Sequence, residues 1–195
     1  MNGQKDSEEE AKVEQNLNFE ALKKNLIDVT IESQIKLGYT KTTIGFYYPM
    51  ESLNSLLDSS LDVEGMSQAL QEFKKIVKNE LGNISVSRDN TRFCIQIPKE
   101  GVEYVHDKGS DTGFLEAFIK KIGRCNVSLD DILEVFYQYS KHVICKKIDM
   151  EDFDYTIYFE DGTPDDFRYC IKFEGCHAIY HRFTPKDYDS IYRMK

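Results

Sequence analysis

Two cysteines and two histidines near the C-terminus have the side-chain types that hold metal ions or act as nucleophiles. They are Cys170, Cys176, His177 and His181. On a β-strand His177 and His181 would stand roughly 13 Å apart, at about 3.3 Å per residue, which is too far for both to bind one zinc ion. Cys176 is expected on the opposite face of the sheet from both histidines. The spacing therefore predicts no metal site among these residues beyond a two-ligand half site of Cys170 and His181, and we expect no cofactor.

Cys170 and His181 are the one pair that strand geometry would bring together. We expect them to be diagonal neighbours on one face of a sheet, near Arg168. A thiolate activated by an imidazole is a nucleophile in hydrolases and transferases, so these residues are the candidates for a catalytic site. A half-buried thiol beside an exposed imidazole explains the same pattern without chemistry. We favour that simpler interpretation and keep the enzyme as an alternative.

Arg88 and Arg92 flank the polar tip of a predicted hairpin, where they are candidates for phosphate contacts. Residues 49–107 follow the order of a winged-helix fold, whose wing arginines can reach nucleic acid. The charges argue against this partner, because residues 62–108 hold seven Lys or Arg and eight Asp or Glu, and the whole chain carries a net charge of −9. Without a basic face, counterion release contributes little to binding. A winged-helix DNA-binding regulator therefore remains an alternative prediction.

An acidic stretch over residues 149–166 holds eight Asp or Glu and no Lys or Arg. Such a density of carboxylates suits calcium, magnesium or a basic partner. The spacing does not fit an EF-hand, because a loop from Asp149 to Glu160 would place Asp154 where the sharp turn needs glycine. We interpret the stretch as a solvated loop.

The candidate residues near the C-terminus lie on a predicted three-strand antiparallel meander. In its first strand Tyr155, Ile157 and Phe159 alternate with more polar residues, and a cluster of turn formers follows. The other two strands are predicted over 167–173 and 176–183. Glu174-Gly175 suits a two-residue loop between them, which would place Phe173 opposite Cys176.

Helical periodicity covers most of the remaining chain. Helices are predicted over residues 18–37, after Pro49, from Asp62 to Leu81, from Lys99 to His106, up to Gly123, and from Ser128 to Tyr139, with a hairpin over 84–97 and an edge strand over 143–148. Asn18, Asp62 and Ser128 are the expected N-caps of three of these helices. These elements predict an α+β fold with two helix-plus-hairpin halves.

The expected organisation has three parts. Residues 1–15 form a disordered acidic tail, residues 16–108 a helical, winged-helix-like half, and residues 109–195 an α+β half in which helices pack on the antiparallel meander. The two halves are either separate domains or one compact domain, and the sequence leaves that choice open.

Composition describes an ordinary globular protein of 195 residues. The N-terminus is acidic and polar where a secretory signal needs a basic start, and no apolar run approaches the roughly 20 residues of a membrane span. The five cysteines are an odd number spread along the chain, which favours reduced thiols. We therefore expect a cytoplasmic protein that has no contact with a membrane.

Four segments resemble an uncharacterised bacterial family. They are NLIDVTIESQIKLGY (25–39), IGFYYPMESLNSLL (44–57), RFCIQIPKEGVEYVH (92–106) and DFDYTIYFEDGTPDDFRYCIKFEGCHAIYHRF (152–183). The family is a domain of unknown function found mainly in gut Gram-positive anaerobes. The resemblance implies a bacterial cytosolic protein and supplies no functional residues.

The main functional prediction is a non-catalytic cytosolic module for binding or regulation. The acidic charge favours a protein or a small-molecule ligand over nucleic acid. Two alternatives stay open: a small hydrolase or transferase that uses Cys170 and His181, and a winged-helix DNA-binding regulator. The oligomeric state is not predicted.

Overall fold

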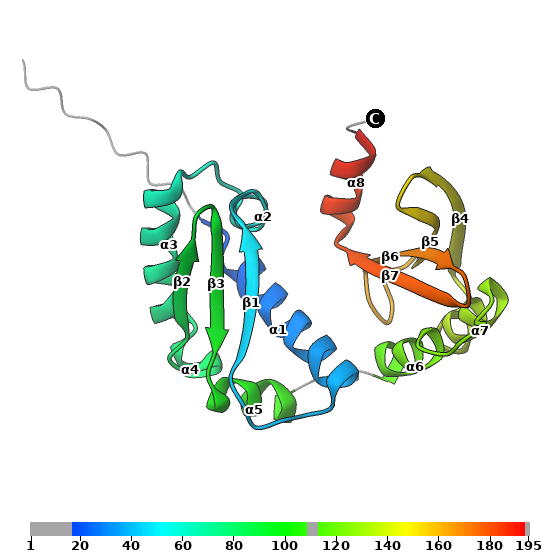
Figure 1. Ribbon diagram of the computed structural model, residues 1–195, viewed down its shortest axis with the longest axis horizontal. Coiled ribbons are helices and arrows are strands. Elements are labelled where there is room, and N and C mark those ends of the chain that lie inside the picture. The colour runs from blue at the N-terminus through cyan, green and yellow to red at the C-terminus, as the bar shows by residue number, and fades with distance from the viewer. Residues whose placement is uncertain (1–16, 109–112, 194–195) are drawn as a thin grey trace, which may run out of the picture. The chain divides into compact units, whose positions relative to one another are not determined.

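A computed structural model describes residues 17–108 and 113–193 (Figure 1). The acidic tail predicted for residues 1–15 lies outside these residues. The chain divides into two compact units: unit 1 comprises Met1–Gln34 and Gly38–Lys108, and unit 2 comprises Ile35–Leu37 and Gly109–Lys195. Each unit contains helices and one antiparallel sheet, which confirms the α+β class predicted from the sequence.

Unit 1 combines helices with a three-stranded sheet in the order β1-β3-β2. Its elements are α1 (Phe19–Leu37), whose last turn is assigned to unit 2, β1 (Ile44–Pro49), α2 (Met50–Leu57), α3 (Val63–Ile76), α4 (Lys78–Leu81), β2 (Ser85–Asp89), β3 (Arg92–Ile97) and α5 (Lys99–Lys108). The helix predicted from Asp62 to Leu81 is in fact two, α3 and α4. They meet at Val77, whose side chain is fully buried.

The core of unit 1 forms between one face of the sheet and the apolar faces of the helices. Alternation along β3 turns Phe93, Ile95 and Ile97 inward, as the period of two of a strand requires. Leucines of α1 and α2 and the apolar stripe of α3 meet them, and the fully buried members include Leu22, Leu26, Leu53, Leu57, Met66, Leu70 and Phe73. Asp62 caps α3 through a 2.8 Å bond from the Gly65 N–H, as predicted.

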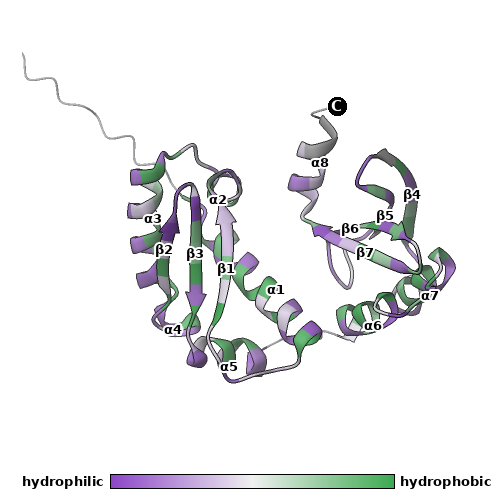
Figure 2. Ribbon diagram, viewed as in Figure 1, coloured by the Kyte–Doolittle hydropathy of each residue, from purple (hydrophilic) through white to green (hydrophobic). Residues whose placement is uncertain are grey.

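Unit 2 places two helices against a four-stranded antiparallel sheet in the order β4-β5-β6-β7. Its elements are α6 (Gly113–Ile122), α7 (Leu129–Tyr139), β4 (Val143–Met150), β5 (Phe153–Phe159), β6 (Arg168–Glu174), β7 (His177–Phe183) and α8 (Pro185–Arg193). The predicted three-strand meander is β5, β6 and β7, and the predicted edge strand joins it as β4. Figure 2 shows hydrophobic segments along α6 and α7, the two helices that pack together beside the sheet.

Aromatic rings form the centre of unit 2. Phe114 and Phe118 from α6 and Phe136 from α7 meet Phe159 and Tyr169 from the sheet. Most of these contacts are edge-to-face, with ring centroids 4.7 Å apart for Phe118 and Tyr169 and 4.8 Å apart for Phe114 and Phe159. Such pairs add about 0.5–1.5 kcal/mol each beyond the burial of their area. The aromatic-rich strands of the meander and the apolar stripes of both helices therefore stabilise one another.

The register of the β6–β7 hairpin differs from the prediction. Its loop is Gly175-Cys176, so Glu174 pairs with His177 and Phe173 pairs with Ala178. Gly175 has φ +61° and Cys176 has no positive φ, as expected when glycine occupies the first position of a two-residue loop. The prediction had placed glycine second. As a result, Cys176 lies in the loop, not on a strand face.

The connection between β5 and β6 is held to the sheet by a partly buried carboxylate. Asp165 accepts a hydrogen bond from the Tyr169 hydroxyl (2.6 Å) and one from the Phe167 N–H (3.2 Å). Burial raises the pKa of Asp165, and this effect outweighs the lowering by these bonds and by the charge of Arg182. Asp154 behaves in the opposite way, because the Phe173 N–H and Lys172 lower its pKa.

The opposite pKa shifts of Asp165 and Asp154 predict opposite effects of pH on the stability of unit 2. A raised folded-state pKa gives stability that is present below the unfolded pKa of about 4 and lost as the pH rises through the folded pKa. The free energy of unfolding of the Asp165→Asn variant, taken relative to that of the wild type, should therefore increase as the pH rises from about 3 to about 7. Asp154→Asn should lose relative stability as the pH rises over the same range. Urea denaturation at several pH values measures both, and slopes of the same sign would contradict the prediction.

Candidate metal centre

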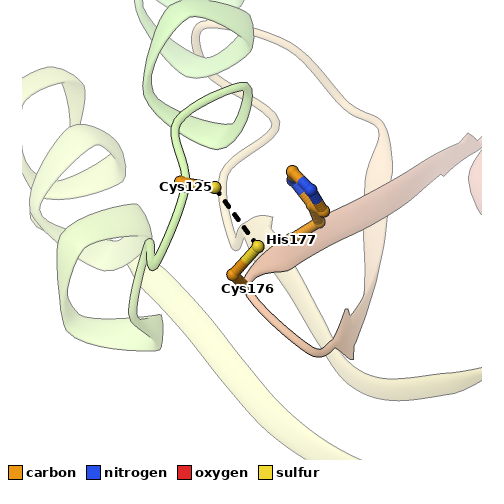
Figure 3. Close-up of side chains that lie close together, drawn as sticks. All are labelled: Cys125, Cys176 and His177. Atoms are coloured by element: carbon orange, nitrogen blue, oxygen red, sulfur yellow. Dashed lines mark hydrogen bonds between the residues drawn. The ribbon is translucent and has the colours of Figure 1, made fainter.

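Two thiols and an imidazole converge at one end of unit 2 (Figure 3). Cys125 comes from the connection between α6 and α7, Cys176 from the β6–β7 loop, and His177 from the first position of β7. The two Sγ atoms and a ring nitrogen of His177 all lie within 4.8 Å of one another. The Cys125 thiol donates a hydrogen bond to the Cys176 Sγ, with 3.2 Å between the sulfur atoms. Residues distant in the sequence thus present three metal-ligand atoms to one point.

Backbone hydrogen bonds hold the two segments against each other. The Asn126 N–H donates to the Cys176 carbonyl at 2.6 Å, so the bond joins the two loops beside the cysteines. Asn126 has φ +59°, a left-handed conformation that asparagine tolerates better than most residues. Ser128 then begins α7 with a capping box that includes Asp131. The position of Cys125 is therefore set by the backbone on its C-terminal side.

The surroundings of Cys125 favour its protonated form in the metal-free protein. The hydrogen bond with the Cys176 thiol raises the pKa of Cys125, partial desolvation raises it further, and the Asn126 N–H lowers it. Both cysteines are exposed, so an ion can reach them from solvent. A coordinating metal ion removes the thiol proton outright, which replaces a shared thiol hydrogen bond by two metal–sulfur bonds.

Two thiolates and an imidazole form a soft donor set. Cysteine sulfur binds zinc at about 2.3 Å and histidine nitrogen at about 2.0–2.1 Å, and thiolates also select copper(I). At tetrahedral angles a zinc ion would hold the two sulfur atoms roughly 3.8 Å apart. In the structure the two sulfur atoms are 3.2 Å apart, so the two exposed loops would have to separate slightly to bind a zinc ion. The three residues therefore fit a zinc or copper(I) ion.

Sequence reasoning missed this cluster for two reasons. The wrong hairpin register placed Cys176 on the face of a strand, pointing away from His177. Cys125 was not considered with them, because 51 positions separate it from Cys176. One signal was present: Cys125 lies in a short connection between two apolar helices that must pack on the meander, so that connection has to lie at an end of the sheet.

The structure places Cys170 and His181 directly opposite each other on β6 and β7, closer than the predicted diagonal. Cys170 is completely buried, and burial raises its pKa to about 11, whereas His181 is exposed. A thiol with such a pKa is protonated at neutral pH and is a weak nucleophile. Arg168 lies over the Tyr158 ring, 3.9 Å from its centroid. The catalytic role of these residues stays a prediction, and the protonated, buried thiol argues against it.

Arg88 and Arg92 flank the tip of the β2–β3 hairpin, as predicted. They lie on opposite faces of it, because Arg88 pairs with Phe93, which points into the core, whereas Arg92 pairs with Asp89 and with Pro49 of β1. The Arg88 guanidinium also lies 4.0 Å from the Glu64 carboxylate. The two side chains therefore do not point toward one phosphate, and phosphate contact stays a prediction.

Among the residues that the structure describes, no helix combines the length and the hydrophobicity needed to cross a bilayer.

The fold and the cluster together define an α+β protein with a surface thiol–imidazole cluster. The chain belongs to the family described as "Domain of unknown function, E. rectale Gene description (DUF3877)", whose model matches residues 19–192. This match confirms the resemblance to a family of unknown function drawn from the sequence. No curated protein and no solved structure was found to match the chain.

Proposed function

We propose that this protein is a non-catalytic cytosolic module for binding or regulation, and that its ligand is a soft transition-metal ion. The observation that carries the proposal is the convergence of the Cys125, Cys176 and His177 ligand atoms within 4.8 Å. Two exposed thiols with an adjacent imidazole are rarely brought together by packing alone, because none of them is needed to fill a core.

A binding role suits this site better than catalysis. Ligand and substrate sites of enzymes are usually concave and bury most of their ligand. Here the two cysteines lie on two surface connections, and both are exposed. An ion at this position would be presented to solvent and would link the α6–α7 connection to the β6–β7 hairpin.

Such a link gives the ion a regulatory effect. A metal ion that binds the folded state and not the unfolded state stabilises unit 2 by mass action, by about 2.7 kcal/mol at a hundredfold excess over the dissociation constant. The main consequence would be a stiffer end of unit 2, where Ser128 caps α7 and β7 begins at His177. The metal-bound and metal-free forms would therefore differ in local stability.

The features of unit 1 indicate which kind of macromolecular partner the protein would bind. The helices of this unit precede a hairpin, and its strands lie in the order β1-β3-β2. This arrangement supports the proposal of a winged-helix-like domain over residues 16–108 and an α+β domain over residues 109–195. The exposed residues of α3 mix both signs of charge and include Glu64, Glu72 and Lys75. Together with the divergent wing arginines, this favours a protein partner over nucleic acid.

The proposal predicts that removing either cysteine abolishes tight zinc binding. The reduced protein should take up Zn²⁺ in competition with a chromophoric chelator, and Cys125→Ser or Cys176→Ser should weaken that binding by more than about 100-fold, because losing a direct ligand exceeds the usual cost of losing its supporting partners. Cys145→Ser is the matched control, since this half-buried cysteine lies in β4 of the same unit. Wild-type protein without zinc affinity, or equal losses in all three variants, would overturn the proposal.

A further inference from the structure

Glu174 is the residue opposite His177 in the β6–β7 hairpin. It pairs with His177, immediately outside the Gly175-Cys176 loop. Directly opposed residues of antiparallel strands project from the same face, with Cβ atoms about 4.5–5.5 Å apart. Glu174 and His177 are both exposed, so neither side chain is fixed by the core. This register places the backbone of Glu174 next to that of His177.

The Glu174 carboxylate does not belong to the group of atoms within 4.8 Å of one another. Neither sulfur atom carries a positive charge that would attract the carboxylate. A divalent cation changes this balance, and an exposed glutamate has three rotatable side-chain bonds with which to turn toward it. Carboxylate oxygens bind zinc at about 2.0–2.2 Å.

We infer that Glu174 is the fourth ligand of the centre formed by Cys125, Cys176 and His177, and that it selects zinc(II) over copper(I). The inference rests on the proposed metal-binding function. Structural zinc sites are almost always four-coordinate, so a three-ligand set is incomplete for zinc. Copper(I) prefers soft sulfur ligands, and a hard carboxylate adds little to its binding. One carboxylate thus distinguishes two metals that share the same thiolates.

The test compares two metals on one variant. Reduced protein is titrated anaerobically with Zn²⁺ and, separately, with Cu⁺, each against a competing chelator. Glu174→Ala should weaken zinc binding about 10–100-fold and leave copper(I) affinity unchanged. Glu116→Ala, which removes an exposed carboxylate from α6 of the same unit, is the control for the change in net charge and should alter neither affinity.

The outcomes separate this inference from the proposed function. Unchanged zinc affinity in Glu174→Ala would overturn the role of Glu174 and leave the three-residue site intact. Equal losses for both metals would also overturn it, because they indicate a general effect on the hairpin. Wild-type protein that binds neither metal would overturn the proposed function and the inference together.

A gain-of-ligand variant tests the position of residue 174 directly. Co²⁺ bound to thiolates has a charge-transfer absorption that grows with the number of sulfur ligands. In Glu174→Cys a third thiolate should raise this absorption in proportion, provided that residue 174 reaches the ion. Absorption equal to that of the wild type would place the side chain outside the coordination sphere and contradict the inference.

Discussion

Replacing Gly101 with alanine is expected to lower the free energy of unfolding of unit 1 by about 3 kcal/mol or more. Gly101 is a buried residue in the first turn of α5, where this helix passes close to the end of α4. A Cβ atom at this position would collide with the Leu81 carbonyl oxygen and lie 2.7 Å from the Ile97 Cγ2. The carbonyl belongs to the backbone of α4, so relief requires α5 to move away from α4.

Two effects of opposite sign compete at Gly101. Alanine in place of glycine stabilises a helix by about 0.8–1.0 kcal/mol, which would make the variant more stable if space were available. The collision is larger, because it displaces a helix whose Val102 and Val105 are buried in the same core. Net destabilisation of unit 1 is therefore expected.

The measurement is urea denaturation of Gly101→Ala beside Gly45→Ala. Gly45 lies in β1 of the same unit, and a Cβ atom there would be 3.4 Å from both the Cys94 Sγ and the Gln96 Cγ, a distance at which side chains can adjust. The control should change stability by less than about 1 kcal/mol. A Gly101 variant as stable as the wild type would show that α4 and α5 do not approach so closely.

The second large effect is expected for Phe118→Ala, which should destabilise unit 2 by about 3–5 kcal/mol. Phe118 is completely buried and contacts the rings of Phe136, Tyr169 and Tyr180 at 4.7–5.8 Å between centroids. Its removal leaves a cavity between α6 and the sheet, and the remaining rings of both elements restrict collapse around it. The loss therefore includes the transfer free energy of the ring, its aromatic contacts and the cavity.

Tyr137→Ala is the matched control in unit 2. It removes a ring of similar size from α7, but this ring is 54% exposed. We expect a change within about 1 kcal/mol, as for most surface substitutions. Thermal unfolding followed by circular dichroism compares the two variants, and similar losses in both would contradict the packing of α6 on the sheet.

The local features of the fold were predictable from the sequence. Asn18, Asp62 and Ser128 were identified as N-caps, and each accepts the expected hydrogen bond in the structure. Alternating aromatics indicated the strands of the meander, and helical spacing indicated α6 and α7. These features depend on residues within a few positions of one another, so the sequence contains them directly.

The candidate site depends on two features that local patterns do not encode. The first is the hairpin register, in which moving Gly175 from the second to the first loop position removes Cys176 from the strand face and makes Glu174 the partner of His177. The second is the approach of Cys125, which follows from the packing of α6 and α7 on the sheet. Tertiary packing decides both, so the sequence alone predicted thiols and imidazoles but not which of them meet.

The break between α3 and α4 has a similar origin. The apolar stripe continues through Val77 to Leu81 and predicted one helix. In the structure Val77 ends α3 and is completely buried together with Leu81. The backbone at Val77 has ψ 0°, away from the roughly −42° of a regular helix, and helical periodicity alone does not indicate this break.

X-ray absorption spectroscopy at the zinc edge of the zinc-loaded protein tests the central claim most directly, because it measures the ligand atoms and their distances. The account predicts two sulfur ligands at about 2.3 Å and two nitrogen or oxygen ligands at about 2.0–2.2 Å, with one sulfur lost in Cys125→Ser and in Cys176→Ser. A shell of nitrogen and oxygen alone, or a sulfur count that neither substitution changes, would show that zinc binds elsewhere and that Cys125, Cys176 and His177 do not form a metal centre.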